Sequence, residues 1–245
     1  MSASRTLATV RRVLRQLAHD PRTVALLLAV PPLLLWLLEI VYRQRPATFQ
    51  SVGVPIFAIV PFITMFLVTS VTVLRERRGG TLERLLTTPL GKGDLLLGYQ
   101  LAFGLVAVAQ TAVLAVVALG LLGLEFAGPT WMVGVVGVLD ALLGSALGLF
   151  ASAFAASEFQ AVQFLPALVF PQLVLGGLLA PTAELPRGLQ VVSDALPLTY
   201  ALRAVRTVSS QADVDAALWN DVAVVAGMVV LAIAVAAATL RRRSA

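Results

Sequence analysis

Six long apolar runs constrain this chain more than any other feature of its sequence. Each is close to the length, about 20 residues, that an α-helix needs to cross the hydrocarbon core of a bilayer. Charged residues make up only 13% of the chain, whereas soluble domains carry about 25%. A soluble globule could not bury this much apolar surface, so we expect an all-α, polytopic membrane protein. The predicted spans are approximately residues 24–42, 52–74, 95–124, 131–154, 164–179 and 222–240.

The distribution of arginine and lysine predicts the orientation of these spans. Basic side chains are concentrated before the first run, between the second and third runs, and after the last run. Positively charged loops remain on the cytoplasmic side of a membrane. We therefore expect both termini in the cytoplasm, with residues 1–23 forming a cytoplasmic segment and residues 24–245 forming the membrane domain.

The segment before the first span has the pattern of a basic amphipathic helix. Its apolar residues recur every three or four positions. They are Leu7, Val10, Leu14 and Leu17. Arg11, Arg12 and Arg15 lie mostly outside this stripe. We expect a helix on the inner membrane surface; the plainer alternative is a set of positive charges that only fixes the topology.

The loop between the second and third spans predicts a short helix with a charged face. Gly79 and Gly80 break the preceding helix, Thr81 is a suitable N-cap, and Pro89 ends the new helix. Its apolar face consists of Leu82, Leu85 and Leu86, whereas Glu83 and Arg84 point elsewhere. Such a helix would lie across the cytoplasmic face and dock a partner; a simple solvated loop is the alternative.

The segment between the fifth and sixth spans predicts two further short helices. Pro186 opens the first, Pro197 ends it, and the second begins near Leu198. Arg203 and Arg206, three positions apart, share one face of the second helix. We expect both helices to dip into the outer leaflet or to lie along it, which requires packing on protein or contact with water.

An acidic residue interrupts the fourth span near its middle. Asp140 is followed at four-residue intervals by Gly144, Gly148 and Ser152, which together form one small and polar stripe. Small residues at this spacing let two helices approach closely. An ionisable side chain at this depth instead marks a substrate or proton path in many membrane proteins. Both interpretations of Asp140 stay open from the sequence.

Several kinds of chemistry lack the residues that they need. The sequence has no cysteine and one histidine, His19, and it contains no phosphate-binding loop of the Gly-x-x-x-x-Gly-Lys-Ser/Thr type. We therefore expect no catalytic residues, no metal site, no bound cofactor and no ATP hydrolysis by this chain. The basic residues flank apolar runs, so binding of nucleic acid is not expected either.

Two stretches resemble a known family. Residues 75–90, Arg-Glu-Arg-Arg-Gly-Gly-Thr-Leu-Glu-Arg-Leu-Leu-Thr-Thr-Pro-Leu, are similar to the signature of type-2 ABC transporter permeases. Residues 185–206, with Leu-Pro at 185 and Leu-Pro-Leu-Thr-Tyr-Ala at 196, resemble the region before the last span of that family. The pair Gly79–Gly80 departs from the family, which more often has a bulky or polar residue before the glycine.

The resemblance implies a six-helix exporter fold and a set of partners. Two copies, or one copy with a related chain, would form the path, and each would pair with a separate ATPase subunit that uses ATP and Mg. The short helix near residue 81 would be the coupling helix, with the expected ATPase contacts Glu76, Thr81, Leu82, Glu83, Arg84 and Leu85. The N-terminal helix would be the interface helix, with Arg11, Arg12 and Arg15. The outer re-entrant segment would contain Pro186, Pro197, Tyr200, Arg203 and Arg206.

The implied function is export of a hydrophobic or amphipathic, drug-like molecule across the cytoplasmic membrane of a prokaryote. Export of a lipid-linked glycan or a lipid is the alternative within the family. From another class, a proton-coupled secondary transporter would use Asp140, with Gly144 and Gly148 beside the path. A membrane scaffold that only recruits a partner through residues 75–94 is a third hypothesis.

Overall fold

The computed structural model describes residues 2–80, 91–179 and 181–239. Every regular element in these ranges is helical, and six of the helices are long and apolar enough to cross a membrane. They are α2 (Pro21–Tyr42), α3 (Pro46–Arg78), α5 (Lys92–Gly120), α6 (Thr130–Ser152), α7 (Glu158–Leu175) and α10 (Ala216–Thr239). The prediction of an all-helical chain with six membrane spans is confirmed.

Several helices extend beyond the apolar runs that predicted them. The helix α3 begins at Pro46 and α7 begins at Glu158, each six positions before its predicted start. Pro46 is well suited to the first turn, where no backbone N–H is needed. Ser157 caps α7 by accepting a hydrogen bond from the backbone N–H of Gln160 at 3.2 Å. Polar turns therefore continue these helices, because backbone hydrogen bonding does not stop where hydrophobicity does.

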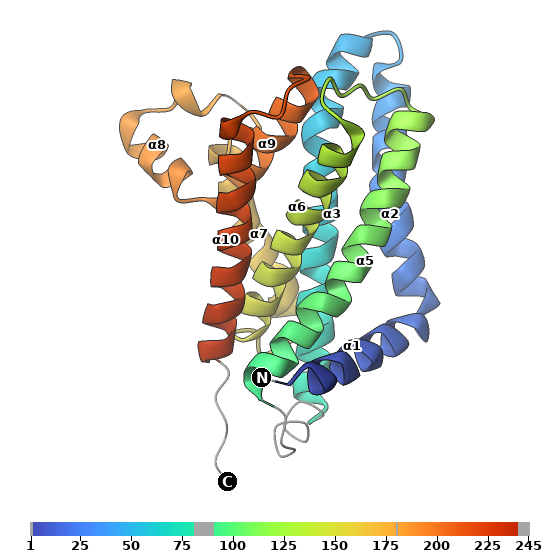
Figure 1. The fold of residues 1–245 in the computed structure, drawn as a ribbon, viewed down its shortest axis with the longest axis vertical. Coiled ribbons are helices and arrows are strands. Elements are labelled where there is room, and N and C mark those ends of the chain that lie inside the picture. The colour runs from blue at the N-terminus through green and yellow to red at the C-terminus, as the bar shows by residue number, and fades with distance from the viewer. Residues whose placement is uncertain (1, 81–90, 180, 240–245) are drawn as a thin grey trace.

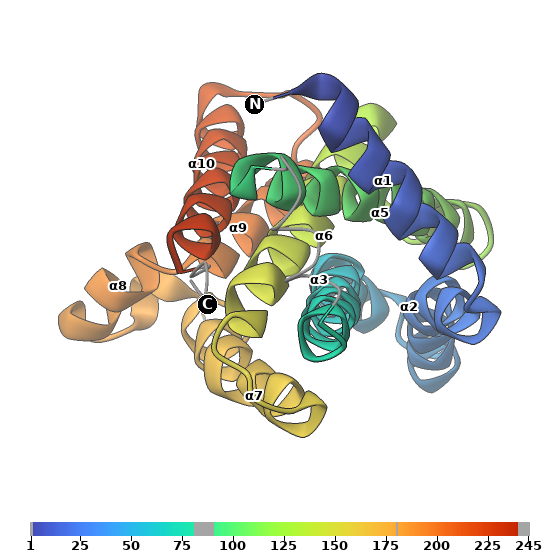
Figure 2. The same cartoon turned by 90° about the horizontal axis from the view of Figure 1, so that it is seen from below.

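The helices α3 and α6 form the central seam of the bundle (Figures 1 and 2). Two glycines of α6 make their close approach possible. A Cβ atom at Gly144 would lie 2.1 Å from the carbonyl oxygen of Phe62, and one at Gly148 would lie 2.6 Å from that of Phe66. The backbones of the two helices are thus in direct contact, and no larger residue fits at these two positions without moving them apart.

Shorter helices cover the two ends of the bundle. The helix α1 (Ala3–Ala18) lies across one end and packs along α5 (Figures 1 and 2). The helices α8 (Arg187–Asp194) and α9 (Pro197–Ser210) lie toward the opposite end, after a 3-10 turn over Thr182–Glu184. We call these the α1 end and the α9 end. Pro186 immediately precedes α8, and Pro197, which the sequence predicts to end the first of these helices, is the first residue of α9.

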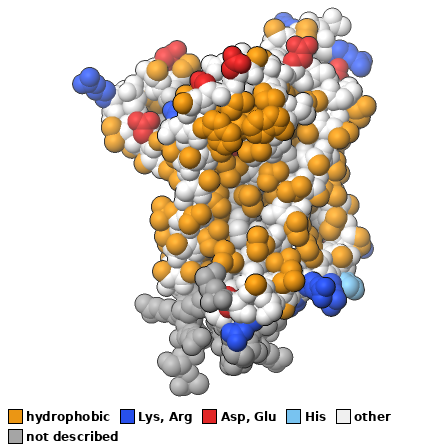
Figure 3. Space-filling model, viewed as in Figure 1, with side chains coloured by type: hydrophobic (Ala, Val, Ile, Leu, Met, Phe, Trp, Pro, Cys, Tyr) orange, Lys and Arg blue, Asp and Glu red, His pale blue; other side chains and the backbone are white. Residues whose placement is uncertain are grey.

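The surface is divided as a membrane requires. Figure 3 shows hydrophobic side chains over the visible flank of the bundle and charged side chains toward its two ends. The helix α2 turns much of its apolar surface outward, with Leu26, Trp36 and Val41 among its exposed side chains. Because a bilayer favours apolar surface at this depth, the fold is that of a multi-pass membrane protein.

Candidate functional site

The last turn of α3 is bound to several other helices at the α1 end. Glu76 accepts a hydrogen bond from Arg12 of α1, with 2.8 Å between Nη1 and Oε2, and another from the hydroxyl of Tyr99 on α5. Arg12 also donates to the Tyr99 hydroxyl at 3.0 Å, and its guanidinium lies 5.5 Å from the centre of that ring. These three side chains form one group that joins α1, α3 and α5.

The electrostatics of this group keep Arg12 charged. Burial alone lowers the pKa of Arg12, but the interactions with Tyr99 and Glu76 outweigh it and raise that pKa above its ordinary value. The Glu76 side chain is only 7% exposed. Its second oxygen, Oε1, is buried and has no hydrogen-bond partner among the described residues. Removal of either charge would leave the other uncompensated in a poorly solvated place, which is costly.

The residues on either side of Glu76 bind two further helices. Arg75 donates from Nε and Nη2 to the two carboxylate oxygens of Glu158 on α7, each at 2.9 Å. Arg77 donates from Nη1 to the carbonyl oxygens of Ser152 and Ala153, at 3.1 and 2.7 Å. Those carbonyls close the C-terminus of α6, where a cation is favourable. Three consecutive side chains thus connect the end of α3 to α1, α5, α6 and α7.

The predicted coupling segment follows directly after this turn. Thr81, Leu82, Glu83, Arg84 and Leu85 lie outside the described residues. Sequence reasoning also assigned Glu76 to a contact with a partner, but one of its carboxylate oxygens is occupied by Arg12 and Tyr99 of this chain. Because Arg12 and Glu76 are 64 positions apart, no local pattern could indicate that they meet.

The helix α1 turns most of its predicted apolar stripe to the bundle: Val10 is buried and Leu14 and Leu17 are half-buried, whereas Leu7 is 58% exposed. Thr9 and Val13, which lie outside the stripe, are also buried. The reason lies on α5, where Gly98 admits the side chain of Thr9: a Cβ atom at Gly98 would lie 2.5 Å from that of Thr9. A pattern based only on apolar residues could not predict that Thr9 packs against Gly98.

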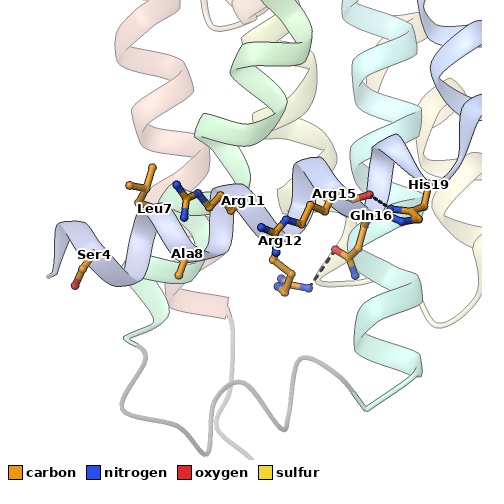
Figure 4. Close-up of a pocket in the computed structure, with 8 residues that line it drawn as sticks. All are labelled: Ser4, Leu7, Ala8, Arg11, Arg12, Arg15, Gln16 and His19. Atoms are coloured by element: carbon orange, nitrogen blue, oxygen red, sulfur yellow. Dashed lines mark hydrogen bonds between the residues drawn. The ribbon is translucent and has the colours of Figure 1, made fainter.

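The opposite side of α1 carries a basic hollow of about 840 Å³ (Figure 4). It is lined by Ser4, Leu7, Ala8, Arg11, Arg12, Arg15, Gln16 and His19. Arg11 and Arg15 are exposed, as the predicted surface helix requires, and Arg12 reaches back to Glu76. The sequence predicts one role for all three arginines. In the structure, Arg11 and Arg15 are exposed, whereas Arg12 forms an ion pair with Glu76.

Asp140 is a buried acidic residue of α6. It is 1% exposed, and its Oδ2 has no hydrogen-bond partner among the described residues. It shares its stripe with Gly144 and Gly148, whose contacts are with the backbone of α3. Close helix packing is thus established at the two glycines, and both interpretations of Asp140 stay predictions.

At the α9 end, a second ion pair joins α9 to α10. Arg203 donates from Nε to Asp221 Oδ2 at 2.7 Å and from Nη2 to Oδ1, and its guanidinium lies 4.8 Å from the centre of the Tyr200 ring. The hydrogen bonds to Asp221 raise the pKa of Arg203. Arg206, by contrast, is half-buried, its pKa is lowered by burial, and its Nη2 lies 3.5 Å from the carbonyl oxygen of Leu178. The two arginines predicted on one face thus have different partners.

Comparison with known proteins defines the class. Residues 4–209 match the family model described as ABC-2 type transporter, and the match covers most of this six-span membrane protein. The chain belongs to the ABC-2 type transporter family and is a membrane permease of that kind of transporter.

Individual relatives are distant. The chain is 26% identical over 145 residues to the probable multidrug ABC transporter permease YbhR of Escherichia coli, covering 59% of this chain and 39% of that permease. It is 28% identical over 160 residues to the inner membrane transport permease YhhJ of Escherichia coli, covering 63% and 41%. It is 28% identical over 150 residues to ABC transporter G family member 20 of Dictyostelium discoideum, covering 61% and 20%. The chain thus spans about two fifths or less of the length of these relatives.

Proposed function

We propose that this chain is the permease part of an ATP-driven exporter that moves hydrophobic or amphipathic small molecules out across the cytoplasmic membrane. The α1 end would face the cytoplasm, which the excess of basic residues at that end supports. The word multidrug in the printed name of the relative YbhR supports a drug-like cargo. A lipid-linked glycan or a lipid is the alternative cargo within the same family.

The observation that carries this proposal is the set of bonds around the last turn of α3. Residues 81–90 follow that turn and resemble a coupling helix, in which Glu83 and Arg84 would contact the ATPase. Arg75, Glu76 and Arg77 bind four different helices just before it. A displacement of the segment would therefore reach α1, α5, α6 and α7 together.

The assembly would contain two ATPase subunits, which bind ATP and Mg, and two permease chains, either identical or related. Residues 1–23 would be the interface helix, with Arg11 and Arg15 free to meet the ATPase. Glu76 would serve as an internal link of the coupling region, because its carboxylate is bonded to Arg12 and Tyr99. Residues 181–206 would close the exit on the outer side.

The mechanism follows from these assignments. ATP binding would close the two ATPase subunits and push the coupling segment of each permease. The last turn of α3 would transmit the movement, and the bundle would open toward the outside. Asp140 would contribute to packing of α6 on α3 and not to proton transport, since the glycines on its stripe contact the backbone of α3.

Co-purification with a co-expressed ABC ATPase subunit from the same organism tests the proposal. The tagged chain is expected to capture the ATPase in detergent and in nanodiscs, and the charge reversals Glu83→Lys with Arg84→Glu are expected to abolish capture. The matched control is Glu184→Lys with Arg187→Glu, two exposed charges near the α9 end, which should leave capture intact. Failure of the unmodified chain to retain the ATPase, or equal capture by both double variants, would contradict the proposal.

A further inference from the structure

A cavity of about 550 Å³ lies between α1, α2 and α3 at the α1 end. Its walls are mostly apolar and include Leu26, Val30, Leu67, Val68, Val71 and Phe103. Leu26 is also 64% exposed, so the cavity reaches the flank of α2 that faces lipid. The volume and the lining are those of a small-molecule site, in which apolar walls surround a few polar groups.

The charged groups of this cavity are two carboxylates and one arginine. Asp20, Glu76 and Arg75 all line it. Arg75 donates to both carboxylate oxygens of Glu158 and also attracts Asp20 electrostatically, so it is shared between two carboxylates. Asp20 is the N-cap of α2, and its hydrogen bonds from the hydroxyl and backbone N–H of Thr23 lower its pKa, so it is ionised at neutral pH. The cavity therefore presents two carboxylates and one arginine, and that arginine is also bonded to Glu158.

One of these carboxylates, Glu76, has an oxygen without a hydrogen-bond partner among the described residues. Glu76 Oε2 binds Arg12 and Tyr99, whereas Oε1 is buried without a hydrogen-bond partner among the described residues. A buried carboxylate oxygen without a partner is costly. Because a carboxylate oxygen accepts and does not donate, the group that would satisfy it is an N–H or O–H donor, and a charged donor would form the stronger bond.

We propose that this cavity binds an amphiphile with an ammonium head, which lies beside the carboxylates of Asp20 and Glu76 while its apolar body lies along α2 and α3. Two sources offer this chemistry: the headgroup of phosphatidylethanolamine and a free lipophilic amine. The inference rests on the proposed function only in treating a free amine as cargo. Entry past Leu26 would deliver either ligand directly from the membrane.

Binding of dansylcadaverine, which joins an apolar ring system to a primary ammonium, tests the site. The full chain is placed in phosphatidylcholine nanodiscs, whose headgroups lack N–H donors, and dansyl fluorescence is titrated. Asp20→Asn, which keeps the helix cap, and Glu76→Gln are each expected to weaken binding about tenfold, as the loss of a charge-assisted contact does. Val71→Trp, which fills the cavity without removing a charge, is expected to abolish binding. Glu39→Gln, at the far end of α2, is the matched control and should bind as the unmodified chain does.

Dansylamide, which lacks the ammonium, is expected not to bind. Equal binding of dansylamide, or unchanged dansylcadaverine affinity in Asp20→Asn and Val71→Trp, would overturn the inference. Nanodiscs containing phosphatidylethanolamine identify the source: weakened probe binding supports the site with the lipid as ligand, and unchanged binding supports it with a free amine. The assay needs no ATPase, so amine binding without ATPase capture contradicts only the proposed function, and capture without amine binding contradicts only this inference.

Discussion

The middle of α3, where it meets α6, and the last turn of α3 are attached to their neighbours by different means. In the middle, the α3 backbone touches α6 directly through Gly144 and Gly148. At the last turn, Arg75, Glu76 and Arg77 reach across to four helices with charged side chains. In its middle, α3 is held at a fixed distance from α6. At its last turn, α3 is connected to its neighbours through long side chains with several rotatable bonds.

This difference indicates where movement is possible. A backbone contact has no adjustable part, so sliding or separation of α3 and α6 would lose packing at once. An ion pair between long side chains tolerates changes of rotamer while the charges stay together. We therefore infer that α3 and α6 move as one unit and that the α1 end rearranges around them.

The largest expected effect is at the seam. Gly144→Ala would place a methyl group 2.1 Å from the carbonyl oxygen of Phe62. Overpacking of this kind costs about 3 kcal/mol, so we expect the melting temperature in detergent to fall by roughly 5–10 °C. Gly134→Ala is the matched control on the same helix, because nothing lies within 4 Å of its Cβ position. If both variants melt alike, the seam is not held as described.

The next effect is at the buried ion pair. Arg12→Met leaves Glu76 without its charged partner, and we expect a loss of about 2 kcal/mol, less than for a fully buried pair because Arg12 is 24% exposed. Adding Glu76→Gln should restore part of that loss, since no buried charge is then left unpaired. Arg11→Met removes the exposed neighbour and should change stability little. A double variant less stable than the sum of its single variants would contradict the pairing.

A smaller effect is expected at the α9 end. Arg203→Gln removes the partner of the buried Asp221 carboxylate. Because Arg203 is about half exposed, water takes over part of its role, and we expect a loss of about 1 kcal/mol. Arg206→Gln, three positions along α9, should have a weaker effect, since burial already disfavours its charge. Thermal unfolding of both variants measures the two losses of stability. A larger loss in Arg206→Gln than in Arg203→Gln would contradict this prediction.

The smallest effect is expected for the exposed pair. Arg75 and Glu158 are 60% and 47% exposed, and pairs of this kind contribute about 0.5 kcal/mol or less. Arg75→Gln should therefore lower the melting temperature only slightly, and the difference should disappear in high salt because mobile ions screen exposed charges. A salt-independent loss would show that the pair is shielded from water.

The spans could be predicted from the sequence because each depends on local hydrophobicity. The proline positions also sufficed to place α8 and α9. The contacts at the last turn of α3 could not be predicted, since Arg12, Glu76 and Tyr99 come from three distant segments and belong to no repeating pattern. The basic pattern of α1 instead grouped Arg12 with Arg11 and Arg15.

The sequence predicts that Asp140, Gly144 and Gly148 share one face of α6, but it does not predict which helix that face contacts. Spacing by four places Gly144 and Gly148 on one face, yet it does not say which helix they meet. The close approach of α3 becomes visible only when the carbonyl oxygens of Phe62 and Phe66 are located. The same holds for Gly98, whose packing against Thr9 sets the orientation of α1.

The central claim, that α3 and α6 move together while the α1 end rearranges, can be tested by spin-label distances in the permease–ATPase complex. The chain has no cysteine, so pairs of labels can be introduced without background. One pair, at Ser51 and Thr130, spans the seam; the other, at Ser4 and Phe159, spans the α1 end, and all four positions are exposed. With ATP bound, we expect the second distance distribution to shift and the first to stay unchanged. A shift across the seam, or no shift at the α1 end, would contradict the account.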